Sequence, residues 1–308
     1  MLQGLKPLVV VGSINTDLVM TADRLPQRGE TIPGTSFQTY QGGKGANQAV
    51  AAAMLGATVM MVGKVGSDAF GAESIRQLQS RGVDCTHVAT EKGDSGLAVI
   101  TVGAAGENTI LVLPGANAAV SPEFVESKRA VIRSAGIVLA QLEIPVESVL
   151  RLGQVCAEEG VPLMLDPAPA RELPQELFAL CRWLTPNETE AMFYAGEMQS
   201  GSAEIAGALL KKGAQGVVLK LGEKGAAIYQ ADADVIAIDP MRVSAVDTTA
   251  AGDTFNGALA AALTAGNGLA ASGRIASAAA ALSVTRMGAQ ASMPGAAEVS
   301  RFLKERNV

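Results

Sequence analysis

Short runs of apolar residues alternate along this chain with segments in which apolar residues recur at helical spacing. The runs are LVVVG at 8–12, ATVMMVGKVG at 57–66, GIVLAQLE at 136–143, VPLMLDPAPA at 161–170 and GVVLKLG at 216–222. Uninterrupted apolarity is typical of strands buried on both faces, as in a parallel sheet covered by helices. The pattern therefore predicts an α/β fold with a doubly wound, mainly parallel sheet flanked by helices.

The intervening segments predict the helices. Residues 45–56 place Ala46, Ala49, Val50 and Ala53 on one face of a helix. Ser121 and Pro122 are typical of a helix start, so a second helix is expected over 122–134. Residues 254–306 are rich in alanine and are expected to be helical, with Gly and Pro marking the breaks.

Two segments, at about 15–43 and 96–113, break this alternation. The first contains short extended pieces separated by Pro and Gly, and the second reads as a hairpin. Neither includes a helix that could complete a βαβ unit, so the two segments are expected to form a small antiparallel β lid over one end of the main sheet. We therefore expect residues 1–308 to form one α/β domain that carries this lid.

Composition narrows the class of protein. Hydrophobic residues make up 48% and charged residues 18% of the 308, which is ample for a core. The net charge of -6 argues against a nucleic-acid partner, which normally requires clustered Lys and Arg. No stretch reaches the length of a membrane span and the N-terminus does not resemble a secretory signal, so a cytoplasmic protein is expected.

The cysteines and the histidine offer no site of their own. Cys85, Cys156 and Cys181 are odd in number and lack metal-ligand spacing, which favours reduced, partly buried thiols. His87 is the only histidine and has no carboxylates beside it. A zinc site or a histidine-based catalytic triad is therefore not expected.

The stretch VDTTAAGDTF, at 246–255, sets two aspartates around small residues just before a helical pattern. Ala250, Ala251 and Gly252 leave the amides of the first helical turn open to an anion. A carboxylate at Asp253 fits there if it accepts the proton of an attacking hydroxyl as general base. On this stretch alone, however, a helix-capping or first-turn acid explains Asp253 better.

The stretch QGGKGANQAV, at 41–50, combines glycines with Lys44 and Asn47 at the start of a helix. Gly43 allows close backbone approach, and Lys44 offers ammonium donors. The stretch is not a Walker A loop, because Gly45 follows Lys44 where Ser or Thr would be required. The chain also lacks the G-x-G-x-x-G dinucleotide fingerprint, and a plain Gly-rich turn remains a serious alternative.

Three further polar residues follow buried strands. Asn15 and Asp17 lie two apart on an extended segment, where an amide and a carboxylate can bind adjacent hydroxyls of a sugar. Glu143 follows the strand near 140, at the edge where ligands of open α/β sheets collect. Ordinary turn residues explain Asn15 and Asp17 equally well.

Asn187 and Glu190, in TPNETE, have the spacing of a helix capping box. They could instead hold waters of a magnesium ion, which needs only one or two protein oxygens. The segment KLGEKG, at 220–225, ends a strand in a Gly-bounded turn that could pass close to a nucleotide, although such turns are common.

The order of these motifs resembles that of the ribokinase-like, or phosphofructokinase B, family of carbohydrate kinases. GGKGANQAVAAA resembles the first signature of the family and DTTAAGDTFNGAL the second, with DPAPAREL and TPNETE between them. The resemblance runs from about Val9 to Leu303. It implies a ribokinase-like fold and ATP-dependent phosphorylation of a sugar, D-ribose at its 5-hydroxyl, to give ribose 5-phosphate.

The resemblance also assigns roles to residues of this chain. Asp253 would be the catalytic base, with the amides of Ala250, Ala251, Gly252 and Asp253 as the anion hole. The sugar would be bound by Asn15, Asp17, Gly43, Lys44, Asn47 and Glu143. The nucleotide would be lined by Lys220, Leu221, Gly222, Glu223, Lys224 and Gly225, with Gly252 at the phosphates and Ser277 near the adenine. Asn187 and Glu190 would serve magnesium and the phosphates. A potassium ion would lie in a loop formed by Asp247, Thr249, Ser283, Arg286, Gly288 and Ser292, mostly through backbone carbonyls. Pairing of two lids would give a homodimer.

One departure from the family pattern is Asp166, which stands where asparagine is expected before PAPA and adds a negative charge near the nucleotide. Deoxyribose, fructose and nucleoside kinases share the second signature, so another sugar or nucleoside substrate remains open. A non-catalytic sugar-binding protein is a second class of function. A nicotinamide-dependent oxidoreductase is a third, although the missing glycine fingerprint opposes it.

Overall fold

A computed structural model describes residues 6–196 and 201–306 of the chain, and within these residues the strands form two sheets. The larger sheet has nine strands in the order β13-β12-β11-β10-β9-β8-β1-β4-β5. The pairs from β10/β11 through β4/β5 are parallel, whereas β12 pairs antiparallel with both β11 and β13. Its strands are β1 (Leu8–Val11), β4 (Val59–Gly66), β5 (Val83–Glu91), β8 (Ile137–Ala140), β9 (Leu163–Leu165), β10 (Cys181–Leu184), β11 (Gly216–Lys220), β12 (Ala226–Gln230) and β13 (Ile236–Ile238). The expected doubly wound, mainly parallel sheet is confirmed.

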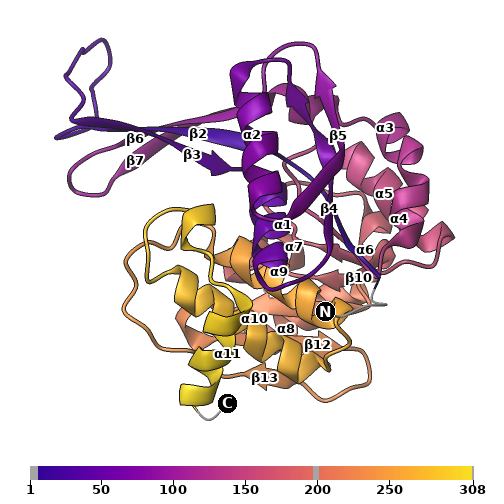
Figure 1. Cartoon of the computed structure of the whole chain (residues 1–308). Coiled ribbons are helices and arrows are strands. Elements are labelled where there is room, and N and C mark those ends of the chain that lie inside the picture. The colour runs from indigo at the N-terminus through magenta and orange to yellow at the C-terminus, as the bar shows by residue number, and fades with distance from the viewer. Residues whose placement is uncertain (1–5, 197–200, 307–308) are drawn as a thin grey trace.

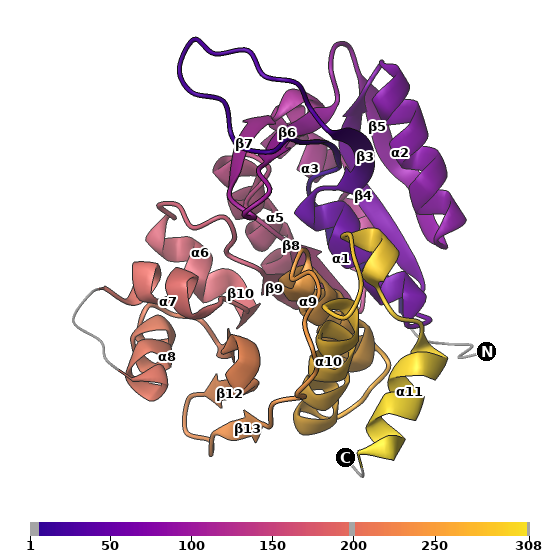
Figure 2. The ribbon, with the colours of Figure 1, turned by 90° about the vertical axis from the view of Figure 1, so that its left-hand side faces the viewer.

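Helices cover both faces of this sheet (Figure 2). Leu8 and Val10 of β1 pack into the core under α1, α9, α10 and α11, and Val9 and Val11 pack into the core on the opposite face. Burial on both faces is why these strands read as uninterrupted apolar runs, and each buried valine contributes roughly 1.5–3 kcal/mol. The helices are α1 (Lys44–Met54), α2 (Ala69–Ser80), α3 (Pro122–Ser127), α4 (Arg129–Ser134), α5 (Val146–Glu158), α6 (Gln175–Leu180), α7 (Glu188–Ala195), α8 (Ser202–Lys211), α9 (Ala251–Thr264), α10 (Leu269–Ser283) and α11 (Ala296–Glu305), with short 3₁₀ turns η1 (Gly115–Ala119), η2 (Gly222–Lys224) and η3 (Gln290–Ser292).

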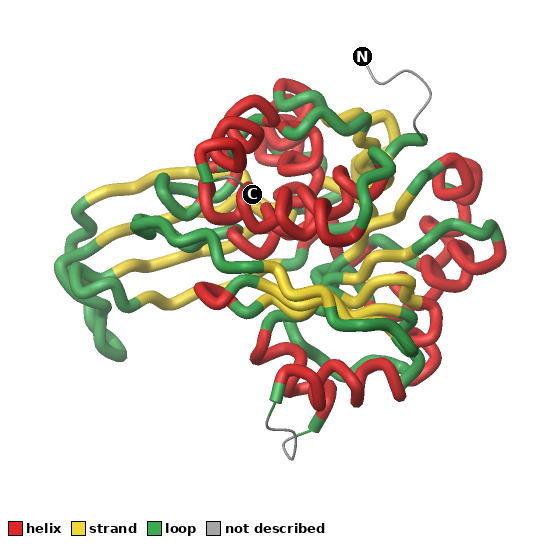
Figure 3. The backbone as a smooth tube through the Cα atoms, turned by 90° about the horizontal axis from the view of Figure 1, so that it is seen from below, coloured by secondary structure: helices red, strands yellow, loops and turns green. Residues whose placement is uncertain are grey.

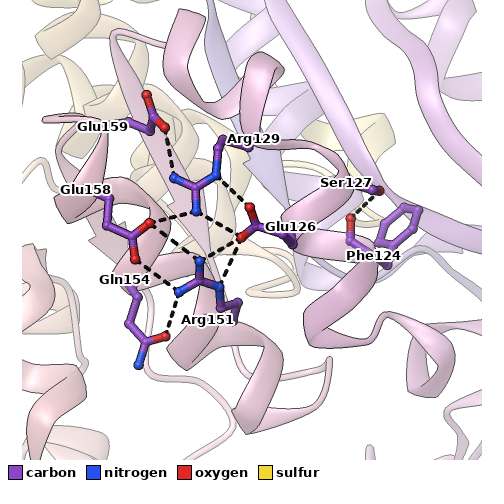
Figure 4. Close-up of polar contacts among 8 residues, drawn as sticks. All are labelled: Phe124, Glu126, Ser127, Arg129, Arg151, Gln154, Glu158 and Glu159. Carbon is purple, nitrogen blue, oxygen red and sulfur yellow. Dashed lines mark hydrogen bonds and ion pairs between the residues drawn. The ribbon is translucent and has the colours of Figure 1, made fainter.

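The single helix expected over 122–134 is wrong in one respect. Ser121 caps it and Pro122 begins it, but the helix breaks at Lys128 into α3 and α4. Arg129 at the start of α4 contacts Glu126 of α3 and both Glu158 and Glu159 at the end of α5 (Figure 4). The break places α4 where this arginine can join three elements. Because the pairs remain partly exposed to solvent, each is worth about 1 kcal/mol or less.

The smaller sheet has the order β3-β2-β6-β7 and extends from the body of the molecule (Figures 1 and 3). It comprises β2 (Asn15–Thr21), β3 (Ser36–Gly42), β6 (Gly96–Val102) and β7 (Asn108–Leu113). Both predicted segments therefore join it. The expected small antiparallel sheet is confirmed as mostly antiparallel, because β3 and β7 pair antiparallel with their neighbours while the central strands β2 and β6 pair in parallel.

The site lies where the strand order of the larger sheet reverses. From β1 the chain continues to β4 on one side and later returns to β8 on the other. The carboxyl ends of β1 and β8 thus border a crevice, the position at which open α/β sheets bind ligands. In the part of the chain that the structure describes, no helix is long and apolar enough to cross a membrane.

Candidate active site

The first turns of α1 and α9 lie against each other at this crevice. The two helices approach closely, because a Cβ on Gly257 of α9 would lie 2.4 Å from the carbonyl oxygen of Gln48 in α1. Only glycine allows this approach. As a result, Asn47 and Gln48 of the first signature meet Asp253 of the second, more than two hundred residues away.

Asp253 is held in place by two amide donors. Asn47 Nδ2 donates to Asp253 Oδ2 at 3.0 Å, and Gln48 Nε2 donates to Asp253 Oδ1 at 3.0 Å. Burial raises the pKa of Asp253 to about 6, against the lowering influence of Lys44. Asp253 is thus mostly ionised at neutral pH, with a pKa near the operating range, as a general base requires.

The backbone amides of residues 250–253, at the start of α9, form a small concave turn, called here the amide cup. Ala250 adopts a left-handed conformation with φ 57°, and α9 begins at Ala251. Amides in a first helical turn have no acceptor four residues back. The Ala251 amide nevertheless donates to the Thr248 carbonyl at 3.2 Å, so one of the four expected anion-hole donors is engaged in the turn. The space beside Gly252 is open, since an added Cβ would have Lys220 Nζ as its nearest neighbour, at 3.6 Å.

The predicted sugar-binding residues gather on the lid side of Asp253. Glu143 accepts hydrogen bonds from Ser13 Oγ at 2.6 Å and from the Lys44 amide at 2.9 Å. Burial, followed by the charges of Glu143 and Asp253, raises the pKa of Asp17 to about 6. Burial alone would lower the pKa of Lys44, but the surrounding carboxylates, Asp253 foremost, raise it. Asp17, Lys44, Glu143 and Asp253 therefore form one electrostatic cluster.

The glycines and Asn15 shape this cluster. Gly43 adopts φ 87° and therefore requires glycine, whereas a Cβ on Gly42 would lie 2.4 Å from a carboxylate oxygen of Asp17 and would displace that side chain. Asn15 Oδ1 accepts a hydrogen bond from Asn117 Nδ2 at 2.7 Å. Asn117 was not identified from the sequence, where it lies in an unremarkable small-residue segment about one hundred positions away.

A cavity of about 1010 Å³ opens beside the amide cup, on the side away from the lid. It is bounded by the turn after β11, the loop before α9, the start of α9 and one face of α10. Its lining residues are Lys220, Gly222, Glu223, Lys224, Gly225, Pro240, Met241, Arg242, Val243, Ala245, Thr248, Ala251, Gly252, Phe255, Ser277, Ala280, Ala281 and Val284. Most of the predicted nucleotide-binding residues, including Ser277, are thus brought together. Leu221 shares the turn without lining the cavity, and loop 240–245 was missed because it carries no motif.

Asn187 and Glu190 form the predicted capping box at the start of α7. Asn187 Oδ1 accepts from the Glu190 amide, and Glu190 Oε2 accepts from the Asn187 amide, both at 2.8 Å. Asn187 also pairs with Lys220 of β11, so the box lies beside the nucleotide cavity. Within residues 6–196 and 201–306, no group of three or more His, Cys, Asp or Glu side chains could hold a metal ion.

A buried polar network connects the two halves of the site. Asp166 Oδ1 lies 3.0 Å from Lys220 Nζ, and its Oδ2 accepts from Gln48 Nε2 at 2.8 Å. Gln48 in turn accepts from Gln141 Nε2 at 2.7 Å. The negative charge of Asp166, the departure noted in the sequence, is therefore paired. Gln48 lies inside the quoted first signature, but its role depends on contacts with residues distant in sequence.

Asp247 connects the turn before α9 to the segment after α10. Its Oδ1 accepts from the Thr249 amide at 2.9 Å and its Oδ2 from the Gly288 amide at 2.8 Å. Burial alone would raise the pKa of Asp247, but the Thr249 side chain and the Gly288 and Thr249 amides together lower it. Ser283 and Ser292 donate their hydroxyls to nearby carbonyls, and Arg286 pairs with Glu298. The six residues of the predicted cation loop thus lie in one turn-rich region, with the Asp247 carboxylate occupied in shaping it.

Comparison with known proteins places this site in context. The model of the pfkB family of carbohydrate kinases matches residues 6–296. A ribokinase of Bacillus subtilis is 42% identical over 303 residues, covering 97% of this chain and 100% of the relative. A deoxyribokinase of Salmonella typhimurium is 36% identical over 303 residues, covering 96% of this chain and 98% of the relative. The structure of an Arabidopsis thaliana ribokinase complexed with ribose and ATP superimposes with a TM-score of 0.93 at 37% identity, covering 97% and 99% of the two chains.

Proposed function

The chain belongs to the pfkB family of carbohydrate kinases, and on that premise we propose that it phosphorylates D-ribose at the 5-hydroxyl with ATP. The observation that carries the proposal is the position of Asp253. Two amide donors fix its carboxylate between Asp17 and Glu143 on the lid side and the cavity of about 1010 Å³. An alcohol on one side and a triphosphate on the other would meet at this carboxylate.

The reaction follows from this arrangement. The ribose 5-hydroxyl donates its proton to Asp253 as its oxygen attacks the γ-phosphorus of ATP. The O5–P bond forms, the bond from the γ-phosphorus to the β,γ-bridging oxygen breaks, and ADP leaves with that electron pair. The amides of the cup, chiefly those of Gly252 and Asp253, stabilise the charge on the phosphoryl oxygens. The protonated Asp253 then returns its proton to solvent.

The sugar would be oriented by the lid side of the site. Asn15 and Asp17 of β2 would bind adjacent ring hydroxyls, together with Glu143, Lys44 and Asn47, which lie near Asp17 and Asp253. A carboxylate accepts two O–H donors at once, which favours a sugar with neighbouring hydroxyls. This feature favours ribose over deoxyribose, the substrate that the name of the Salmonella relative indicates.

Magnesium is part of this proposal. Near the cavity, Glu190 and Asn187 offer one carboxylate and one amide, both of which also form the capping box. The described residues contain no cluster that could enclose a metal by itself. Such a sparse donor set fits magnesium, which keeps several waters and binds through one or two protein groups and the phosphates. The ion would supply neutralisation of the phosphate charge. Asn187 and Glu190 would hold its waters.

A potassium ion in the loop of Asp247, Thr249, Ser283, Arg286, Gly288 and Ser292 is also proposed. The Asp247 carboxylate joins Thr249, in the turn just before the anion hole, to Gly288, so an ion held by the carbonyls of this loop would lie next to that turn. We expect kcat to rise several-fold when potassium replaces sodium at equal ionic strength, because a filled loop fixes the turn that presents the amides. Asp247→Asn replaces one acceptor oxygen with a donor and should reduce this gain. Equal kcat in sodium and potassium would contradict the assignment.

We propose that the lids of two copies pair to form a homodimer. Ile110, Leu111 and Val112 of the edge strand β7 are exposed, Leu111 to 75% of its surface, and an unprotected apolar edge normally requires a cover. Sedimentation equilibrium should give a dimer for the wild type and a monomer for Leu111→Lys. The control variant Val235→Lys, at an exposed position between β12 and β13, should leave the dimer intact. A monomeric wild type would refute the pairing.

The compartment is a further part of the proposal. Cys85, Cys156 and Cys181 are free and buried, and a kinase that uses ATP would act in the cytoplasm, where thiols stay reduced. Fractionation of cells that express the chain would test this placement, and recovery outside the cytoplasmic fraction would oppose it.

The function itself is tested by an acceptor panel. ADP release should be measured with ribose, deoxyribose, fructose and a nucleoside, in the presence of ATP, magnesium and potassium. Ribose is expected to give the highest kcat/KM. A faster reaction with another acceptor would make the chain a kinase for that compound, and sugar binding without ADP release would make it a binding protein.

A further inference from the structure

We propose that the side chain of Lys220 binds the phosphoryl group during its transfer, and that Asp166 is the residue that positions this ammonium group. The inference deepens the proposed function, because it rests on a nucleotide occupying the cavity of about 1010 Å³. The KLGEKG motif assigns Lys220 to the nucleotide site only as part of a turn. The proposal gives its ammonium group a role of its own.

The ammonium group lies at the mouth of the amide cup. Lys220 is the last residue of β11, its side chain is 12% exposed, and it lines the cavity together with Ala251 and Gly252. Its Nζ lies 3.6 Å from the position that a Cβ on Gly252 would occupy. Because glycine leaves this space open, an anion resting on the first-turn amides would also lie within reach of Nζ.

Asp166 determines where the ammonium group stays. Its side chain is 2% exposed and lies 3.0 Å from Lys220 Nζ. The second carboxylate oxygen accepts from Gln48, whose amide nitrogen also donates to Asp253. An unbroken series of contacts therefore joins Lys220, Asp166, Gln48 and Asp253. An ammonium group has three N–H donors, and the contact with Asp166 leaves donors for a ligand.

The surrounding charges indicate why a cation is needed here. The Asp166 carboxylate lies close enough to Glu190 and Asp253 to add to the negative charge at both, while Lys44 opposes that charge at both and Lys220 opposes it at Glu190. Without Lys220, a phosphate group that approached would meet the Asp166 carboxylate with its ion pair removed. Lys220 must therefore do one of two things: neutralise Asp166 alone, or neutralise Asp166 and also bind phosphoryl oxygens.

A double-mutant cycle separates these two roles. Lys220→Met removes the ammonium group, Asp166→Asn removes the buried carboxylate, and the double variant removes both charges while keeping similar side-chain volumes. If Lys220 binds phosphoryl oxygens, kcat should fall about 10- to 100-fold in Lys220→Met, the effect of losing a charged hydrogen bond. The double variant should stay at least about tenfold below the wild type. Recovery of the double variant to wild-type kcat would overturn the proposal, since Lys220 would then serve only to neutralise Asp166.

Nucleotide affinity supplies a second readout that requires no sugar. Calorimetry with magnesium should show that Lys220→Met weakens binding of a non-hydrolysable ATP analogue about tenfold, with little change in ADP affinity, because Nζ lies at the cup for the terminal phosphate. Equal losses for both nucleotides would contradict that placement. Thermal unfolding identifies a variant that fails to fold, and Lys220→Arg, which retains the charge, should keep most of the preference for the ATP analogue. A wild type that binds both nucleotides but leaves ribose unphosphorylated would refute the proposed substrate. The affinities of the wild type and the Lys220 variants for the ATP analogue and ADP would still decide the role of Lys220.

Discussion

Replacing Asp253 by asparagine should lower kcat with ribose and ATP by about 10²- to 10⁴-fold, the usual contribution of a general base. The amide has the same shape as the carboxylate but cannot accept the hydroxyl proton. It also presents an NH₂ group to one of the two amide donors, Asn47 Nδ2 or Gln48 Nε2, that now contact the carboxylate at 3.0 Å. Steady-state release of ADP measures the effect.

Sugar and nucleotide affinities in Asp253→Asn should change much less than kcat, because the neighbouring binding groups remain. Asp234→Asn is the matched control, since it makes the same chemical change at an exposed position between β12 and β13. It should retain wild-type kcat. Near-complete turnover in Asp253→Asn would show that another group removes the proton.

The second large effect is expected at Asp17. Asp17→Asn should lower kcat/KM for ribose by about 10²-fold or more, because a carboxylate that accepts two hydroxyl donors is replaced by a group with one acceptor and one donor. The Asp17 carboxylate packs against the backbone of Gly42, where a Cβ would be 2.4 Å from its oxygen. The kinetic loss should appear mainly in the KM for the sugar.

Nucleotide binding shows whether the effect of Asp17→Asn is confined to the sugar site. ATP affinity measured without sugar should be unchanged in Asp17→Asn, because Asp17 does not line the nucleotide cavity. Asp23→Asn, at an exposed position just after β2, serves as its control and should behave as the wild type. An unchanged kcat/KM for ribose in Asp17→Asn would remove this residue from the sugar site.

The parts of the fold that could be predicted are those with a strong local signal. Strand β1 reads as an apolar run because both of its faces are buried, and α3 begins where Ser121 and Pro122 indicate. The parallel pairing of β2 with β6 could not be predicted, because it joins segments about eighty residues apart whose local sequences fit either direction. The edge strand β13 is short and carries little signal.

The candidate site divides in the same way. Asp253 and Lys44 lie in contiguous motifs, and the position of each at a helix start follows from the local pattern. The contacts of Gln48 with Asp166, Asp253 and Gln141 could not be predicted, since they span sequence separations of about one hundred to two hundred residues. The pairing of Asp166 with Lys220 likewise appears only when β9 and β11 take their places in one sheet. Interactions between distant segments, and not local preferences, complete this site.

Asp253 is proposed to direct phosphoryl transfer from ATP to the 5-hydroxyl of ribose. Phosphorus NMR of a reaction containing ribose, ATP, magnesium and potassium tests it most directly. One new phosphate ester is expected on the ribose 5-oxygen for each ADP formed, and no such ester from 5-deoxyribose, which lacks the acceptor. An ester at another ribose oxygen, or unchanged ribose and ATP under conditions where both bind, would contradict it.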